Sequence, residues 1–375
     1  MTRKSASQTL SYLPQFTTRK VTAVPTGRSS DLPDSLAEWA ARYLTLAVIG
    51  VRSPAVTQKI ALHLDRFVGF FVASYGHDRV TTCLKRDVIA WQRALIDQGL
   101  APATVNNHLA SLSGCTTWVA AQVPGVFPVG DPAKGIGELG LPALEPRALS
   151  PNQVRSLKNV CDRLERFHQK KGGRWTGSGP PPLKKQSRPL RDRAIVSVLL
   201  STGLRREELV QLDLEQINPN TVDGLRQARQ GRISRVRGKG RTERTVFLSA
   251  DARQALADYL ARERGQDTSD DSMALFLSAT GIPARATDGR LSARAINLIL
   301  EQIGRWHDAE FSDPARQISP LRPHDLRHTF AFQLAAATGA DPYELERRLG
   351  HRSQRYIQRY TNPPEEVAAA YVEEF

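Results

Sequence analysis

The sequence predicts a mainly α-helical protein with one small antiparallel β-sheet, an α+β fold arranged in two domains. Its 375 residues suffice for two domains at roughly 100–200 residues each. Apolar residues recur at helical spacing through residues 31–125, whereas residues 232–237 alternate polar and apolar as a half-buried strand does. Between these regions, residues 126–149 are rich in Pro and Gly and show no periodicity, which indicates an interdomain linker.

The first 125 residues predict a basic arm followed by a small helical domain. Residues 1–30 combine Ser, Thr and Pro with several Arg and Lys, as a flexible N-terminal arm does. Residues 31–125 predict four helices, with Pro54 in the first turn of the second and Thr104 capping the fourth. The aromatic residues lie at helical spacing, so we interpret them as core. The four apolar stripes are Leu36, Trp39 and Tyr43; Ile60, Leu64, Phe67 and Phe71; Val88, Trp91 and Leu95; and Val105, Leu109, Leu112 and Val119.

Residues 150–375 predict a second, larger domain. Ser150-Pro151 opens its first helix, and residues 191–201 form a helix of the fully buried type. The strand at 232–237 turns back through Gly238-Lys239-Gly240 into a second strand at 242–248. Further helices are expected after Ser249 and Ser292, and a short strand at 275–277. The Gly-, Pro- and Lys-rich segment 169–189 is interpreted as a surface insertion, and the acidic, amphipathic residues 363–375 as a docking tail.

Composition points to a nucleic-acid partner. Lys and Arg number 52 against 38 Asp and Glu, a net charge of +14, with a pI of about 10.0. No apolar run reaches the roughly 18 residues that span a membrane, and the polar, basic start does not predict a signal peptide. The three cysteines are far apart and show no metal-ligand spacing. We therefore expect a cytoplasmic, nucleoid-associated protein without disulfides, metal or other cofactor.

One C-terminal stretch brings together groups suited to phosphate chemistry. His324, Arg327 and His328 have i, i+3, i+4 spacing, so they share a helix face near a helix start. An imidazole beside a guanidinium suits an anionic oxygen that must also exchange a proton. Gly350 ends the next short helix, and His351 follows it. Tyr360 then supplies a candidate nucleophile, with Tyr356 one turn earlier as the alternative.

Two further basic groups belong to this pattern. Arg205 begins a helix after Thr202-Gly203-Leu204, where it is placed to bind phosphate; the alternative is a surface ion pair with Glu208. Lys239 lies at the tip of the hairpin between two glycines. The hairpin arginines are more numerous than a solvated face needs, and with four basic residues of the helical domain they are the predicted DNA-backbone contacts. These candidates are Arg235, Arg237, Arg241, Arg244, Lys59, Arg66, Lys85 and Arg86.

In order and spacing, these motifs resemble the tyrosine recombinases, also called the phage integrase family. The motifs are Thr-Gly-Leu-Arg205-x-x-Glu208-Leu, Gly-Lys239-Gly, His324-x-x-Arg327-His328, Leu-Gly-His351 and Tyr360-Thr. The resemblance covers the second domain and implies a catalytic domain at 150–375, preceded by a helical core-binding domain at 31–125. The insertion at 169–189 and the long basic stretch before the hairpin depart from the family pattern.

The resemblance also implies a role for each residue. Tyr360 attacks a DNA phosphodiester, giving a 3′-phosphotyrosyl bond and a free 5′-hydroxyl, while Arg205 and Arg327 hold the non-bridging oxygens. Lys239 protonates the departing 5′ oxygen, His324 acts as acid and base toward the tyrosine, and His351 hydrogen-bonds the phosphate. Glu208 orients the arginines, and His328 is a supporting, structural histidine.

The expected function is therefore site-specific recombination of double-stranded DNA by a homotetramer, with a monomer in solution as one possible free state. Service to a mobile element, through integration, transposition or resolution, is the favoured setting; chromosome or plasmid dimer resolution is the alternative. A type IB topoisomerase uses a similar residue set, and a non-enzymatic DNA-binding protein could retain the fold. The helical first domain and the short length argue against the topoisomerase. The intact set of reactive residues argues against the non-enzymatic DNA-binding protein.

Overall fold

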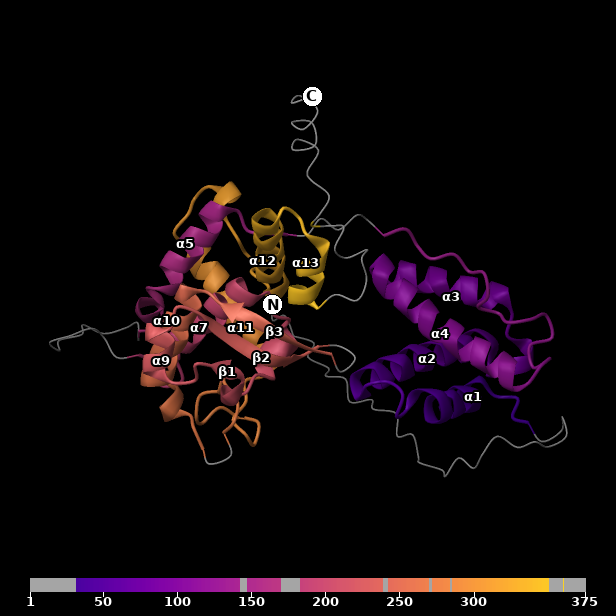
Figure 1. The fold of residues 1–375 in the computed structure, drawn as a ribbon. Helices are drawn as coiled ribbons and strands as arrows, with labels where there is room; N and C mark the ends of the chain where they lie inside the picture. Colours follow the sequence, from indigo (N-terminus) through magenta and orange to yellow (C-terminus); the bar gives the residue numbers. More distant parts are fainter. Residues whose placement is uncertain are drawn as a thin grey trace, which may run out of the picture. The chain divides into compact units, whose positions relative to one another are not determined.

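The computed structural model describes residues 32–141, 147–169, 183–238, 242–269, 272–283 and 285–350, together with Tyr360 (Figure 1). The chain divides into two compact units between residues 143 and 144. Both are mainly helical, and the second carries a three-stranded antiparallel sheet, which confirms the predicted fold class. The arm at 1–30, the tail at 363–375 and most of the insertion at 169–189 lie outside the described residues.

The first unit is built from helices packed on an aromatic core. Its elements are α1 (Leu36–Tyr43), a π-helical turn (Leu44–Val48), α2 (Pro54–Tyr75), a 3₁₀ turn (Val80–Thr82), α3 (Lys85–Asp97) and α4 (Pro102–Gln122). Trp39, Phe67, Phe71 and Trp91 are at most 2% exposed, as expected for core residues. The fourth helix begins at Pro102 after Ala101, so the prediction that Thr104 caps it was wrong. Proline at the first turn, rather than a side-chain cap, sets this start.

The expected linker begins later than the sequence indicated. Phe127 and Ala133 are buried in the core of the first unit. The side-chain amide of Asn106 exchanges two hydrogen bonds of 2.9 Å with the backbone of Leu139. Residues 126–141 therefore belong to the helical unit, although their Pro and Gly content hides this from a search for periodicity.

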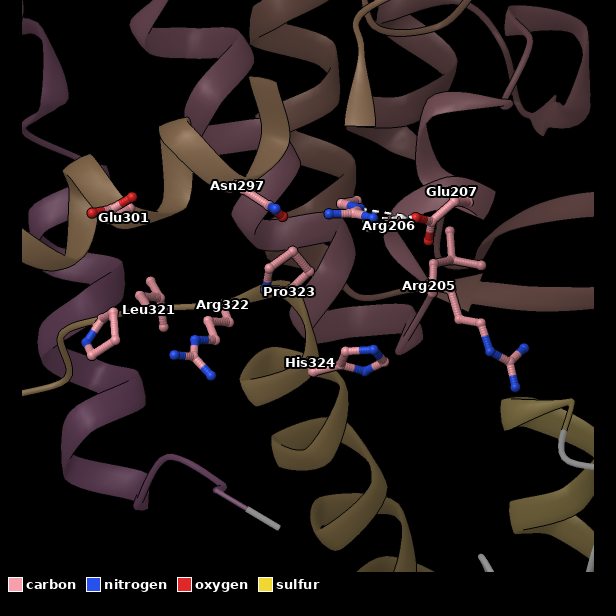
Figure 2. Close-up of a pocket in the computed structure, with 11 residues that line it drawn as sticks. Arg205, Arg206, Glu207, Asn297, Glu301, Leu321, Arg322, Pro323 and His324 are labelled. Carbon is pink, nitrogen blue, oxygen red and sulfur yellow. Dashed lines mark hydrogen bonds and ion pairs between the residues drawn. The ribbon is translucent and has the colours of Figure 1, made fainter. Parts of the chain in front are cut away.

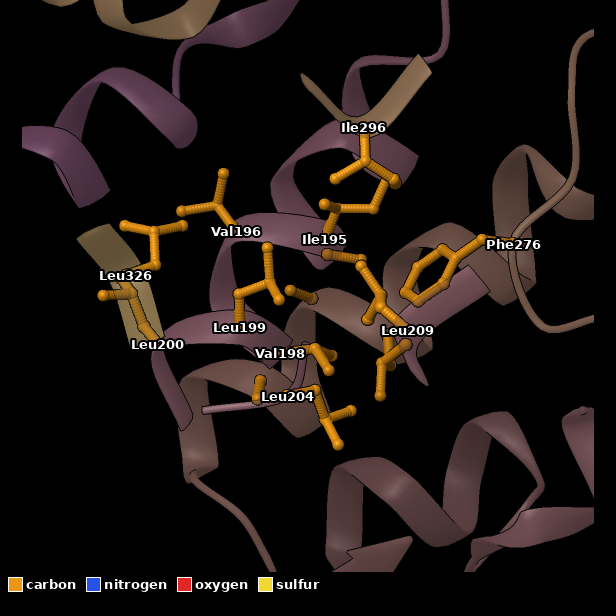
Figure 3. Packing of buried hydrophobic residues seen from close by; sticks show 14 of the residues in the cluster. Ile195, Val196, Val198, Leu199, Leu200, Leu204, Leu209, Phe276, Ile296 and Leu326 are labelled. Atoms are coloured by element: carbon orange, nitrogen blue, oxygen red, sulfur yellow. The ribbon is translucent and has the colours of Figure 1, made fainter. Parts of the chain in front are cut away.

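The second unit is organised around one buried helix, α7 (Pro189–Thr202). Figure 3 shows Ile195, Val198 and Leu199 of α7 among apolar side chains from several other elements. The helices around it, with the bounds that the structure gives, are α5 (Pro151–Cys161), α6 (Leu164–His168), α8 (Arg206–Val210), α9 (Val222–Gln227), α10 (Ala250–Arg262), α11 (Ala293–Asp308), α12 (Pro323–Thr338) and α13 (Pro342–Leu349). Short 3₁₀ turns lie at Leu214–Gln216, Arg264–Gln266 and Pro314–Arg316.

The sheet has the order β1 (Ile217–Asn218), β2 (Gly231–Arg237) and β3 (Glu243–Leu248), with both pairings antiparallel. A bulge lies between Ile233 and Val236 of β2, where Arg235 takes the left-handed φ of 53°. The predicted strand at 275–277 is not a ladder. Among the described residues it forms isolated bridges only, Leu277 with Arg290 and Ala274 with Asp213.

Gly203 closes α7 at a point where a side chain does not fit. Its φ of 60° is left-handed, and a Cβ built on it would lie 2.3 Å from Cδ1 of Phe330 on α12. The glycine therefore allows α12 to pack close against the end of α7. This close approach sets how α12, which carries His324, Arg327 and His328, lies against the end of α7, two residues before Arg205.

We predict that Gly203→Ala lowers the free energy of unfolding by roughly 2 kcal/mol or more, because left-handed strain and the clash with Phe330 add together. The matched control is Gly339→Ala, which shares a left-handed φ of 63° but has nothing within 4 Å of the added Cβ. The control should lose only about 1 kcal/mol. Urea unfolding of both variants measures the difference, and equal losses would show that the Phe330 contact is unimportant.

Candidate active site

Arg327 is held between the ends of two other helices. It lies in the first turns of α12, which begins at Pro323, and it is 3% exposed. One Nη donates to the carbonyl oxygen of Gly203 at the end of α7. The other donates to the carbonyl oxygen of Leu349 at the end of α13, at 2.7 Å. The C-terminal carbonyls of helices have no intrahelical donors, so they suit a guanidinium.

Positive charge accumulates around this arginine. Burial and the neighbouring charge of Arg205 lower the pKa of Arg327 to about 9, with Arg244 acting in the same sense. Glu208 and Tyr360 oppose the shift. A local excess of cations over anions is relieved by a bound anion, so the site favours a phosphate group.

Arg205 lies at the N-cap of the five-residue helix α8 and is tied to Glu208. Its backbone N–H donates to Oε2 of Glu208 and its Nη1 donates to Oε1, both at 2.8 Å. Its Nη2 reaches the carbonyl oxygen of Gly350 at 3.3 Å. The ion pair considered as the alternative therefore exists, and it orients Arg205 toward the end of α13. The side chain remains 28% exposed, so it is accessible to a ligand.

Glu208 is shared by two arginines. Arg244 on β3 donates Nη1 to Oε1 at 3.0 Å and Nη2 to Oε2 at 2.7 Å. Burial opposes ionisation, but the hydrogen bonds and charge of Arg244, with those of Arg205, lower the pKa of Glu208 to about 2. The carboxylate is therefore ionised throughout the neutral range.

The geometry of Arg244 differs from the surface contact expected from the sequence. Its side chain is only 9% exposed, and its Nε donates to the carbonyl oxygen of Arg348 at 2.9 Å. Two residues further along β3, Val246 is buried, so strand alternation places Arg244 on the inner side of the sheet. That alternation was the sequence signal that could have found it.

Tyr360 and His328 meet through a direct hydrogen bond. Nδ1 of His328 lies 2.7 Å from the hydroxyl of Tyr360. The tyrosine is 6% exposed and its ring packs edge-on against Phe332, with centroids 5.2 Å apart. Sequence reasoning gave His328 a supporting role without naming this contact, since only the fold brings a residue 32 positions away to α12.

His324 lies on the wall of a pocket of about 470 Å³ between α8, α11 and the start of α12 (Figure 2). Its imidazole points toward the side of the pocket where Arg205 lies. Burial and the charges of Arg327 and Arg205 lower its pKa, so the ring is mainly neutral at neutral pH. A neutral imidazole is able to accept a proton. Arg206 and Glu207, which also line the pocket, form an ion pair with each other.

The remaining predicted residues fall into two groups. Lys59, Arg66, Lys85 and Arg86 of the first unit and Arg235 and Arg237 of the second are exposed, as a DNA-backbone contact requires. Arg235 pairs with Glu215 at 2.9 Å, and Arg237 with Glu243 at 3.9 Å. Lys239, Arg241 and His351 lie outside the described residues, as does the alternative nucleophile Tyr356.

The described part of the chain holds neither a metal cluster nor a membrane helix. Within the described ranges, no group of three or more His, Cys, Asp or Glu side chains is placed to hold a metal ion. No helix in the same part of the chain has the length and apolar character needed to cross a bilayer.

Comparison with known proteins identifies the class. The phage integrase family matches residues 181–366. The tyrosine recombinase XerC of Corynebacterium efficiens is 30% identical over 274 residues, which cover 73% of this chain and 71% of that protein. The chain therefore belongs to the tyrosine recombinases of the phage integrase family, whose members are DNA strand-transferring enzymes. This confirms the predicted family and enzyme class.

Solved structures share the fold at low sequence identity. The Tn1549 transposon integrase in complex with a circular intermediate DNA is 16% identical, with a TM-score of 0.65 over 91% of this chain and 99% of that chain. The site-specific recombinase XerH bound to its difH substrate is 15% identical, with a TM-score of 0.59 over 91% and 97%. The small sheet and surrounding helices therefore follow the architecture of this class.

We predict that Glu208→Gln destabilises the protein by roughly 1–3 kcal/mol at pH 7, because it breaks a buried pairing with two arginines. The pKa of Glu208 falls from 4.5 to about 2 on folding, so ionisation stabilises the fold above pH 4.5. This contribution is lost as pH drops through about 2, and the difference between wild type and variant should shrink over that range.

Urea unfolding between pH 7 and pH 2.5 measures this dependence. The matched control is Glu207→Gln, whose side chain is 63% exposed and pairs with its neighbour Arg206. It should change stability by less than about 0.5 kcal/mol. If Glu208→Gln behaved like this control at pH 7, the shared carboxylate would not be a stabilising element.

Proposed function

We propose that this protein is a site-specific DNA recombinase that cuts and rejoins strands through a covalent bond between Tyr360 and a 3′-phosphate. The observation that carries the proposal is the meeting of Tyr360, His328 and the buried Arg327 in one site. Tyr360 forms a hydrogen bond with His328, and the charges of Tyr360 and Arg205 both influence the pKa of Arg327. A tyrosine hydroxyl, a proton acceptor and two guanidiniums are the groups that phosphodiester transfer requires.

The reaction follows from these groups. The hydroxyl of Tyr360 turns from His328 to the phosphorus and loses its proton to an imidazole, for which we assign His324. The bond from phosphorus to the 5′ oxygen then breaks, and Lys239 protonates that oxygen as it leaves. Arg205 and Arg327 bind the non-bridging oxygens, where charge accumulates in the transition state. His351 adds a hydrogen bond to the same phosphate.

The covalent intermediate conserves the energy of the phosphodiester. A 5′-hydroxyl from a second duplex attacks the phosphotyrosine, reforms a DNA strand and releases Tyr360, so strands are exchanged without ATP. We assign this exchange to a homotetramer on paired DNA sites, with residues 31–125 as a core-binding domain. The exposed basic residues of the predicted set contact the DNA backbone: Lys59, Arg66, Lys85, Arg86, Arg235 and Arg237. Service to a mobile element, on DNA of the cytoplasmic nucleoid, is the setting we propose. The tyrosine recombinase relatives support recombination rather than topoisomerase activity.

We predict that Tyr360→Phe binds its DNA site with near-normal affinity but forms no covalent adduct, because only the attacking oxygen is removed. The measurement is denaturing electrophoresis of protein incubated with a nicked site. The nick traps the adduct because the short fragment that bears the free 5′-hydroxyl diffuses away and cannot reverse the reaction. Tyr356→Phe is the matched control and should form the adduct. Adduct formation by Tyr360→Phe, with loss in Tyr356→Phe, would identify the other tyrosine as nucleophile.

We predict that Lys239→Ala cleaves ordinary DNA slowly but recovers on DNA with a 5′-phosphorothiolate at the scissile position. Sulfur leaves without a proton, so the general acid is no longer needed. Single-turnover cleavage of the two substrates measures the recovery. Equal impairment on both would remove Lys239 from the role of general acid.

A further inference from the structure

We propose that Arg244 is a positioning residue for the strand-transfer reaction: it fixes Arg205 through Glu208 and ties the β2–β3 hairpin to the end of α13. The proposal rests on the function proposed above, because Arg205 is the group whose position it sets. Arg244 itself is not assigned a contact with DNA. Its guanidinium is directed inward, to one partner on α8 and one on α13.

The first link runs from Arg244 to Glu208. The two side chains form a two-pronged pair of 3.0 Å and 2.7 Å, with side chains only 9% and 6% exposed. Each carboxylate oxygen also accepts one bond from Arg205, so Glu208 receives four donors in all. Planar bidentate pairing fixes the orientation of a carboxylate more closely than a single bond does. Arg244 therefore determines where Glu208 presents its oxygens to Arg205.

The second link runs from Arg244 to the end of α13. Nε donates to the carbonyl oxygen of Arg348 at 2.9 Å. Nη1 lies so close to Gly350 that a Cβ built there would be 3.0 Å away. Arg205 donates to the carbonyl oxygen of that same Gly350. One short turn, which leads directly to His351 in the sequence, is thus held by two arginines that share one carboxylate.

The third link is to the base of the hairpin. Gly238 donates its N–H to the carbonyl oxygen of Thr242 at 2.7 Å, which joins the ends of β2 and β3. A Cβ built on Gly238 would lie 3.6 Å from Nη1 of Arg244. The guanidinium therefore lies near Gly238, the residue that precedes Lys239 in the sequence. One side chain thus holds the carboxylate that orients Arg205 and lies close to the described end of β2.

Removing Arg244 would leave Glu208 buried with Arg205 as its remaining partner. An ionised carboxylate in a buried site then draws Arg205 toward itself, away from the geometry a phosphate needs. Small misplacement of a preorganised group reduces cleavage by up to roughly 100-fold. DNA affinity should change far less, because Arg244 makes little contact with solvent.

The test is a double-mutant cycle on single-turnover cleavage at saturating DNA, with Arg244→Ala, Glu208→Gln and the pair of changes. If Arg244 acts through Glu208, each single change should slow cleavage on the order of 10- to 100-fold. The double variant should be no slower than the worse single variant. Arg244→Lys should recover part of the rate, because it restores the charge but not both hydrogen bonds. Thermal melting and site affinity, measured for every variant, show that the compared proteins are folded and bound.

A direct DNA contact predicts a different result. In that case Arg244→Ala would reduce the slope of log affinity against log salt by about 0.9. The cleavage rate of the double variant would then fall by the product of the two single fold-reductions, within about twofold. That result would overturn the proposal. The matched control is Arg232→Ala, an exposed arginine on the same sheet, which should leave the cleavage rate at saturating DNA unchanged.

Failure of this proposal is separable from failure of the proposed function. If the wild-type protein forms the adduct but the fold-reductions in cleavage rate multiply in the double variant, Arg244 has no positioning role. The recombinase assignment would then remain intact. Wild-type protein that binds its site but forms no adduct would overturn the recombinase assignment and this proposal with it. Strong coupling with unchanged salt dependence supports both.

Discussion

The carboxylate of Glu208 is the interaction on which the candidate site depends. It is buried, ionised and shared by Arg205 and Arg244, which come from different parts of the second unit. A buried carboxylate is stable only when its charge is matched, so the two arginines are held as firmly as the acid itself. Together with Arg327 the cluster has three guanidiniums for one carboxylate. The surplus positive charge suits an anionic ligand such as a phosphate group.

Helix ends provide the second constraint. The three arginines donate to four backbone carbonyls, all at the C-terminal ends of α7 and α13: those of Gly203, Arg348, Leu349 and Gly350. Such carbonyls lack intrahelical donors and carry the negative end of the helix dipole. Gly203 and Gly350 end these helices with left-handed φ angles, which turn the chain sharply at the points where the arginines bind. Gly203 and Gly350 thus place the backbone carbonyl oxygens that accept hydrogen bonds from the arginines.

Local patterns were sufficient to predict much of this fold. Apolar spacing and turn residues located α7, the hairpin and the helices after Ser249 and Ser292, because these features lie within a few residues of one another. The motif order also identified the family. Contacts between distant segments could not be obtained this way: the bond from His328 to Tyr360 depends on how the chain folds back onto α12. Phe127, in a Pro- and Gly-rich stretch, is buried through packing that no periodicity signals.

Arg244 shows how composition and pattern can disagree. The density of basic residues in the hairpin favoured a DNA contact, whereas strand alternation places this one arginine on the inner side with Val246. The structure follows the alternation, and the charge of Arg244 is paired with Glu208. A basic residue on a strand should therefore be interpreted as a DNA contact only after strand alternation has shown which face of the sheet it occupies.

The most direct test of the account is the identity of the residue that becomes linked to DNA. Protein trapped on a nicked site can be digested with protease and nuclease, and the modified peptide sequenced by mass spectrometry. The account predicts a nucleotide attached through its 3′-phosphate to Tyr360. Attachment to any other residue, or adducts bearing a 5′-phosphate, would contradict it.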